Sequence, residues 1–288
     1  MKYSITVPNF GEFADPRVLA ELAAEAETSG WDGFFVWDHI VEDKSQRRTI
    51  ADPWVLLTAA GLATDRIRLG TIVTPVARRR PQKLAREVAT LDRLTQGRMV
   101  LGVGLGAPID DEYGSFGEPT DPRELAARLD EGLELLDRLW SGERVTYQGR
   151  CHTALDVRFA PTPVQRPRVP IWVGGNWPNR GPLRRAARWD GAVPNLPGRD
   201  TGRPPLDRDV RDAATRLRQL RTEAGRADQP FDLVVGGTTS PGPDAEATVA
   251  GLAEAGANWW NESRSFTAAD LEQAAPIRTR IQAGPPAR

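Results

Sequence analysis

The segment FFVWDHI (residues 34–40) runs from a strand-like stretch into two polar side chains, and the interpretation of the chain starts here. Residues 34–37 are the aromatic and branched types that pleated sheets favour. Asp38 and His39 interrupt this run, and burying either of them without a partner would cost free energy. The chain contains only two histidines. We therefore predict that this strand ends in an active site.

On both sides of this segment the chain alternates between strand-like and helix-like patterns. Near-continuous apolar strands separated by helices are typical of a parallel sheet that is buried on both faces. Strands are expected at 3–8, 33–37, 67–75, 98–106, 169–175, 190–195, 231–237 and 258–263. Helices are expected at 15–29, 52–64, 81–95, 122–140, about 205–224 and 244–255, with a short one from Pro182 and a last one from near Thr267.

Eight such units close naturally into a (β/α)₈ TIM barrel. The competing fold is an open, doubly wound sheet, which would normally need fewer strands. We predict one barrel domain over residues 1–282, followed by a disordered tail at 283–288. Residues 107–168 are too long for a loop. We interpret them as an insertion after the fourth strand that lies over the C-terminal mouth of the barrel, with the helix at 122–140 and a hairpin turning around Gly149.

Composition excludes several classes of protein. A formal charge of −1 argues against nucleic-acid binding, and the basic run ARRRP (77–81) is interpreted as a solvated loop. No stretch approaches the roughly 18 consecutive apolar residues that cross a bilayer, and the N-terminus does not resemble a signal peptide. A lone cysteine, Cys151, forms no internal disulfide and no thiolate zinc site. We expect a cytoplasmic protein without a membrane or nucleic-acid partner.

The C-terminal ends of the strands should supply the reacting groups, as in other α/β barrels. They combine one imidazole, one adjacent acid, several glycines and aromatic side chains, which suits a planar heterocycle better than a metal cage. His39 and Asp38 are the catalytic candidates, whereas His152 in the expected hairpin is interpreted as structural. The candidate cofactor-binding residues are Asn9, Thr71, Ile72, Val73, Gly104, Gly106, Gly174, Gly175, Asn176 and Arg180.

Two glycine-rich segments require different interpretations. GVGLGA (102–107) is not a dinucleotide-binding fingerprint, because its third glycine comes one place early and the residues after it are not expected to be helical. GGNWPNRGP (174–182) follows a strand and enters a helix with Pro182 at its start. Its free N–H groups, together with Arg180, could hold a phosphate.

Several segments together resemble the bacterial luciferase-like superfamily of flavin- or deazaflavin-dependent (β/α)₈ oxidoreductases. They are WDHI, DPWVLLTAAGLATDRIRLGTIVTP, RRRPQKLAREVATLDRLTQGRMVLGVGLG and VPIWVGGN…LRRAARWDG, and the resemblance covers most of residues 3–195. It implies a tricyclic redox ring in the barrel mouth, a phosphate near the loop after the fifth strand, and a homodimer.

The resemblance also implies roles for individual residues. Asp38 and His39 match the Asp-His pair of the deazaflavin branch, in which the histidine lies beside the redox ring. Thr71 and Ile72 match the position of a non-proline cis peptide bond. Two sets of glycines match the edge of the ring pocket and the phosphate loop: Gly104 and Gly106 for the first, and Gly174 and Gly175 with Asn176 for the second.

Two departures from the family pattern narrow the expectation. Ala107 stands where the sugar-phosphate dehydrogenases of the deazaflavin branch carry a glutamate, so we do not expect activity on a sugar phosphate. The paired histidines of luciferases are absent, which argues against light emission.

The expected function is oxidoreduction of a small, partly apolar substrate with FMN or the deazaflavin coenzyme F420, and the Asp-His pair favours F420. FMN would allow monooxygenation, whereas a deazaflavin restricts the chemistry to hydride transfer, with His39 exchanging a proton. Two alternatives stay open at this point. One is a metal-assisted barrel lyase or hydrolase that uses Asp38 and His39 with Asp110 and Asp111, and the other is a flavin-binding protein without catalysis.

Overall fold

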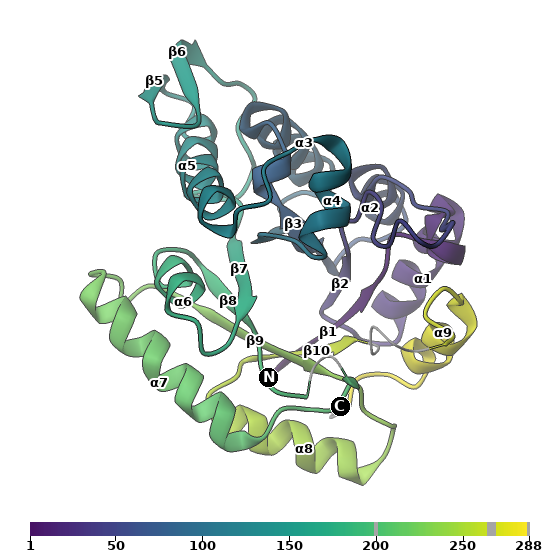
Figure 1. Cartoon of the computed structure of the whole chain (residues 1–288). Helices are drawn as coiled ribbons and strands as arrows, with labels where there is room; N and C mark the ends of the chain where they lie inside the picture. The colour runs from purple at the N-terminus through teal and green to yellow at the C-terminus, as the bar shows by residue number, and fades with distance from the viewer. Residues whose placement is uncertain (199–200, 264–268, 287–288) are drawn as a thin grey trace.

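Eight parallel strands close into a barrel in the order β1-β10-β9-β8-β7-β4-β3-β2 (Figure 1). The structure is a computed structural model, and it describes residues 1–198, 201–263 and 269–286. This confirms the predicted (β/α)₈ barrel. The barrel strands are β1 (Lys2–Val7), β2 (Gly33–Val36), β3 (Arg68–Pro75), β4 (Met99–Gly104), β7 (Ile171–Asn176), β8 (Gly191–Asn195), β9 (Asp232–Gly237) and β10 (Trp259–Ser263).

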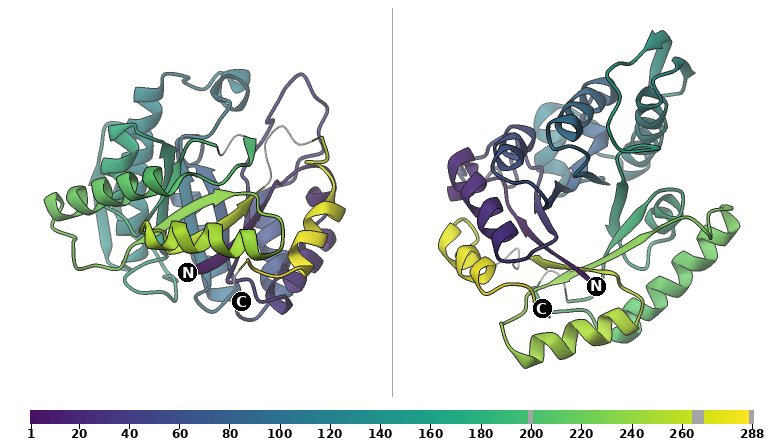
Figure 2. Two further views of the ribbon diagram at one scale, coloured as in Figure 1. Left: turned by 90° about the horizontal axis from the view of Figure 1, so that it is seen from below. Right: turned by 180° about the vertical axis from the view of Figure 1, so that it is seen from behind.

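Helices surround the strands, as the rear view in Figure 2 also shows. Three of them start at an Asp-Pro pair: Asp15, Asp52 and Asp121 each accept a backbone N–H of the first turn, and a proline without an N–H follows. The helices between successive barrel strands are α1 (Pro16–Thr28), α2 (Pro53–Leu62), α3 (Pro81–Leu94), α5 (Pro122–Trp140), α6 (Arg180–Ala186), α7 (Asp207–Glu223) and α8 (Pro243–Glu254), and α9 (Ala274–Gln282) follows β10.

The last helix begins later than the pattern predicted. The expected start at Thr267 lies outside the described residues, and α9 begins at Ala274. The tail at 283–288 stays a prediction, since residues 287–288 also lie outside the described part. In the described part of the chain, no helix is both long and apolar enough to cross a membrane.

The segment between β4 and β7 differs from the predicted insertion. Its long helix α5 packs against α3 and takes the place of a barrel helix. The added elements are α4 (Ile109–Glu112), a 3₁₀ turn η3 (Gly114–Phe116), and the antiparallel hairpin β5 (Arg144–Gln148) with β6 (Thr153–Arg158). The one-turn α4 lies in a stretch that was not expected to be helical.

The predicted position over the mouth is wrong for the hairpin, although the first residues of the segment, 107–112, do border the mouth. The hairpin stands beside α5, away from the barrel strands (Figure 1). Glu131 of α5 holds its turn by accepting the backbone N–H groups of Arg150, Cys151 and His152. The mouth is bordered instead by residues 105–112, which include α4.

Aromatic side chains fill the N-terminal half of the barrel. Trp172 and Trp259 pack with ring centroids 5.1 Å apart, and Phe35 lies 5.4 Å from Trp172. Two glycines make room for these rings: a Cβ on Gly191 of the neighbouring strand β8 would come within 2.4 Å of the Trp172 ring, and one on Gly33, in the same strand as Phe35, within 2.7 Å of the Phe35 ring. Since this end is filled, the barrel opens toward its C-terminal end.

Candidate active site

A pocket of about 850 Å³ opens at the C-terminal ends of β2, β3, β4, β7 and β8. Its volume lies in the range of about 300–1,000 Å³ that holds small ligands and cofactors. The predicted site residues that line it are Asp38, His39, Ile72, Val73, Gly104, Gly106, Gly174, Gly175 and Asn176. Further lining residues that the sequence analysis did not select include Trp37, Lys44, Pro75, Ile109, Glu112, Pro122, Asn179, Arg185 and Asn195.

Three predicted residues lie outside the pocket lining. Asn9 and Thr71 are fully buried behind it, and Arg180 is exposed at the start of α6. Asn9 acts on the pocket indirectly: its Nδ2 donates to the carbonyl of His39 at 2.9 Å, and its Oδ1 accepts the His39 N–H at 3.2 Å. The two hydrogen bonds fix the backbone from which the imidazole projects.

The pocket wall on β3 is formed by a bulge. The register between β3 and β4 shifts between Thr71 and Thr74, and the Ile72–Val73 peptide bond is cis. The cis bond therefore lies one residue later than the Thr71–Ile72 bond that the family resemblance suggested. Thr71 still pairs with Leu101 in the regular register. Its hydroxyl donates to the carbonyl of Gly102 at 3.0 Å and accepts from the Thr74 hydroxyl at 2.9 Å, so it braces the base of the bulge.

Two of the predicted glycines make room for Val73. A Cβ on Gly104 would lie 2.8 Å from one Val73 methyl, and a Cβ on Gly174 would lie 2.9 Å from the other. Gly106 is a glycine for a different reason: its φ of +80° is a backbone conformation that residues with a side chain rarely adopt. The glycines thus shape the apolar wall from behind and allow Val73 to face the pocket.

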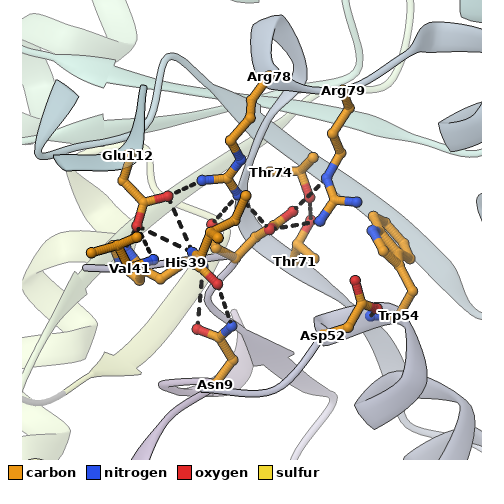
Figure 3. Close-up of polar contacts among 12 residues, drawn as sticks. Asn9, His39, Val41, Asp52, Trp54, Thr71, Thr74, Arg78, Arg79 and Glu112 are labelled. Atoms are coloured by element: carbon orange, nitrogen blue, oxygen red, sulfur yellow. Dashed lines mark hydrogen bonds and ion pairs between the residues drawn. The ribbon is translucent and has the colours of Figure 1, made fainter. Parts of the chain in front are cut away.

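The imidazole of His39 lines the pocket beyond the end of β2, the strand next to β3 in the barrel. Its Nδ1 is 3.2 Å from Oε1 of Glu112, and its side chain is 16% exposed. Burial lowers the pKa of His39 to about 4, so the ring is uncharged at neutral pH. Because Nδ1 is engaged by Glu112, Nε2 is the ring nitrogen left to face a ligand (Figure 3).

Glu112 is a pocket residue that the sequence analysis missed. Its buried carboxylate accepts the backbone N–H groups of residues 40, 41 and 42, and Arg78 donates to it through Nη1. The only signal in the sequence was its place in the acidic run 110–112. That run was considered only as part of a metal site.

Two arginines bind both carboxylate oxygens of Asp38. Arg79 binds both carboxylate oxygens, with Nε 3.0 Å from Oδ2 and Nη2 2.7 Å from Oδ1. Arg78 donates to Oδ1 at 2.8 Å and also to the Asp38 carbonyl at 2.9 Å. The interpretation of ARRRP as a solvated loop was therefore wrong for these two arginines, whose side chains are 5% and 17% exposed and point toward buried acids (Figure 3).

The acids proposed for a metal site do not converge. Asp111 pairs with Lys44 at 3.1 Å, and Asp38 is held by arginines. Among the residues that the structure describes, no group of three or more His, Cys, Asp or Glu side chains is placed to hold a metal ion.

A polar end of the pocket lies at the ends of β7 and β8. The Nδ2 of Asn195 donates to Oδ1 of Asn176 at 2.8 Å. The buried Oδ1 of Asn195 has no hydrogen-bond partner in the described part of the chain. Asn195 was also missed, although it ends an expected strand.

Comparison with known proteins agrees with this geometry. A family model described as luciferase-like monooxygenase matches residues 2–285. The F420-dependent glucose-6-phosphate dehydrogenase of Nakamurella multipartita is 34% identical over 230 residues, which are 76% of this chain and 64% of that protein. The protein with the same description from Beutenbergia cavernae is 38% identical over 159 residues, or 54% of this chain and 45% of its own length. The chain thus spans between about half and two thirds of the length of these curated relatives.

Solved structures share the fold at low identity. An F420-dependent secondary alcohol dehydrogenase in complex with an F420–acetone adduct superimposes with a TM-score of 0.78 at 18% identity, covering 100% of this chain and 99% of that one. The coenzyme F420 dependent tetrahydromethanopterin reductase of Methanopyrus kandleri gives a TM-score of 0.73 at 18% identity, with 98% and 96% covered. With a barrel, a bulged third strand and a family match along nearly the whole chain, this protein belongs to the luciferase-like monooxygenase family.

Proposed function

We propose that the chain is an F420-dependent oxidoreductase that transfers a hydride between the cofactor and a small, partly apolar substrate. The observation that carries this proposal is the uncharged His39, which lines a pocket of cofactor size together with the apolar residues of the β3 bulge. The names of the curated relatives favour F420 over FMN as the cofactor.

The residues of the pocket fit such a group. Ile72, Val73 and Pro75 present an apolar surface against which a flat ring can pack. At the other end, the unpartnered Oδ1 of Asn195 and the open backbone of Gly174 and Gly175 suit the polar part of a cofactor. A bound F420 or FMN would supply a ring that takes up or releases a hydride.

His39 performs the proton transfer in this proposal. A bound cofactor ring would supply the acceptor for the hydride that the substrate carbon gives up, and Nε2 of His39 would take the hydroxyl proton as the C=O bond forms. Burial lowers the pKa of His39 to about 4, so its imidazole is unprotonated at neutral pH and Nε2 can accept the proton of a hydroxyl. We propose oxidation of an alcohol as the reaction, because it uses this unprotonated form.

Asp38 is assigned a positioning role. Its side chain is fully buried, and both of its carboxylate oxygens are bound by arginines. It fixes the strand end that carries His39, and it does not contact the substrate.

A homodimer is proposed as the assembly. Between Pro53 and Leu62 helix α2 carries no charged residue, yet the side chains of Val55 and Leu62 are 59% and 71% exposed. An apolar face of this kind on a surface helix is typical of an interface, and a second copy of the chain would cover it.

Cofactor titration and steady-state turnover test the proposed function. F420 and FMN are titrated separately into the protein by fluorescence quenching, and turnover is measured with a panel of secondary alcohols and with glucose 6-phosphate. We expect F420 to bind more tightly, an alcohol to be oxidised, and glucose 6-phosphate to be inactive because Ala107 replaces the family's glutamate.

A histidine variant then tests the assigned proton acceptor. His39→Ala should lower turnover at least about 100-fold while the F420 dissociation constant changes only a few-fold. His152→Ala is the matched control, because that histidine lies outside the pocket. Failure of both cofactors to bind at millimolar concentration, or unchanged turnover in His39→Ala, would refute the proposal.

A further inference from the structure

The carboxylate of Glu112 is surrounded by N–H donors. Three consecutive backbone N–H groups, those of Ile40, Val41 and Glu42, donate to it at 2.8–3.2 Å. Arg78 adds a guanidinium N–H. These four N–H groups can only donate, and an ionised carboxylate, which only accepts, satisfies all of them. Glu112 is therefore the acceptor in each of these contacts.

The same logic applies to the ring of His39. Its Nδ1 lies 3.2 Å from Oε1 of Glu112, so a hydrogen bond forms only if Nδ1 carries the proton. In a neutral imidazole the other nitrogen then has a lone pair. The backbone of His39 is fixed from the opposite side by Asn9, so the ring cannot easily leave this contact.

Two other glutamates show what such a contact does when no imidazole nitrogen is hydrogen-bonded to the carboxylate. Glu27 accepts the N–H groups of residues 65, 66 and 67, and Glu131 accepts those of residues 150, 151 and 152. Each one pins a loop to a helix. Glu112 pins the loop after β2 in the same way, and it also accepts hydrogen bonds from the imidazole of His39 and from Arg78. Loop anchoring alone therefore does not account for the partners of Glu112.

We infer that Glu112 is the positioning residue of His39: it imposes the Nδ1–H tautomer, so that the Nε2 lone pair faces the pocket and can take a proton from a substrate hydroxyl. The role of this lone pair in proton transfer rests on the proposed function. The tautomer itself follows from the contacts of Glu112 and His39 alone. During the reaction the O–H bond breaks and the proton passes to Nε2, and Glu112 then lies next to the imidazolium that forms.

An amide at position 112 should invert the tautomer. The side chain of Glu112→Gln has one accepting oxygen and one NH₂ group. The backbone N–H groups and Arg78 can only donate, so the imidazole is the one neighbour able to accept from the NH₂ group. His39 would then hold its proton on Nε2 and lose its ability to take one from a substrate. In the serine-protease triad, the corresponding acid-to-amide change lowers kcat about 10⁴-fold by selecting the wrong tautomer.

Long-range ¹H–¹⁵N NMR spectra of the cofactor-free protein, labelled in its histidines, measure the tautomer directly. The chain has two histidines, and His152→Gln assigns the signals. At pH 7 we expect a protonated Nδ1 and an unprotonated Nε2 for His39, and the opposite pattern in Glu112→Gln. A protonated Nε2 in the wild-type spectrum would overturn the inference without any variant, and so would an unchanged pattern in Glu112→Gln.

Kinetics supply the second readout. Glu112→Gln should lower kcat at least about 100-fold with the F420 dissociation constant changed only a few-fold, while the matched control Glu131→Gln keeps wild-type kcat. An equal loss of kcat in Glu112→Gln and Glu131→Gln would show that the loss comes from weakened loop anchoring, and it would overturn the inference. If the wild-type protein turns over no substrate with either cofactor, the proposed function fails, and the NMR spectra still decide the role of Glu112.

Discussion

Gly174→Ala should disturb the β3 bulge by pushing on the side chain of Val73. The new Cβ would lie 2.9 Å from a methyl group of Val73, and its next neighbours are backbone oxygens at 3.5 and 3.8 Å. Val73 alone must therefore move. Overpacking of this kind costs about 1–3 kcal/mol. If Val73 moves into the pocket, a loss of the same size in binding free energy weakens F420 binding by roughly 5- to 150-fold.

Removal of the methyl groups of Val73 should rescue this variant. We expect Val73→Ala/Gly174→Ala to unfold with a free energy within about 1 kcal/mol of Val73→Ala alone, because the new methyl occupies vacated space. Gly102→Ala is the control that Val73→Ala cannot rescue, since its Cβ would lie 2.0 Å from the carbonyl oxygen of Thr71. Urea denaturation followed by tryptophan fluorescence measures the wild type, the three single variants and the two double variants that carry Val73→Ala, and fluorescence titration measures F420 affinity.

The coupling between positions 73 and 174 is the decisive quantity. Contacting residues show interaction free energies of about 0.5–3 kcal/mol in a double-mutant cycle, whereas independent residues are additive. Additive effects of the two substitutions would refute the assignment of these glycines as the space for Val73. Equal rescue of Gly102→Ala would show that Val73→Ala stabilises the barrel for an unrelated reason.

Three further predictions concern stability and assembly. Asp38→Asn removes the carboxylate that the buried guanidinium groups of Arg78 and Arg79 share, and it should lower the free energy of unfolding by about 3–5 kcal/mol. Asp156→Asn, which removes an exposed ion pair, should cost less than about 1 kcal/mol in the same urea titration. Burial lowers the pKa of His39 to about 4, whereas the pKa in the unfolded chain is 6.5. Above pH 6.5 the imidazole is neutral in both states and the folded protein keeps its full stability. As the pH falls from 6.5 toward 4, the unfolded state binds the proton first, and the free energy of unfolding drops by about 1.4 kcal/mol per pH unit, or about 3 kcal/mol in all. His39→Gln should flatten that pH dependence in urea titrations between pH 7.5 and 4.5, and equal slopes in the two proteins would contradict the burial argument. Leu62→Glu on α2 should convert a dimer to a monomer in light scattering, and an unchanged mass would place the interface elsewhere.

Much of the barrel was predictable because its signals are local and repeated. The helix starts at Asp52 and Asp121 combine an N-cap acid with proline, and the structure shows both caps. The strand ends were equally informative: most of the polar and glycine residues selected there line one pocket. Parallel strands place their C-terminal ends on the same face, so a residue's position along its own strand predicts its neighbours in space.

The site's electrostatics were not predictable from such signals. Glu112 lies on a single helical turn with no period to detect, and its partner His39 is 73 residues away in the sequence. Arg78 and Arg79 belong to a basic run that would normally be solvated, and only the buried acids on neighbouring segments turn them inward. The position of the bulge in β3 depends on register with β4, which no single-strand pattern encodes.

The two walls of the pocket are held in different ways, and this difference bears on how the protein could change its substrate. The β3 wall is part of the barrel: Val73 is confined by glycines on two neighbouring strands, so a change there disturbs the fold. The second wall, formed by the loop after β2 and by α4, is held together by the carboxylate of Glu112 and the guanidinium of Arg78. Side chains of α4 that face the pocket without taking part in that junction, such as Ile109, can vary without moving His39. Specificity can therefore diverge on this wall while the cofactor wall and the proton acceptor stay in place.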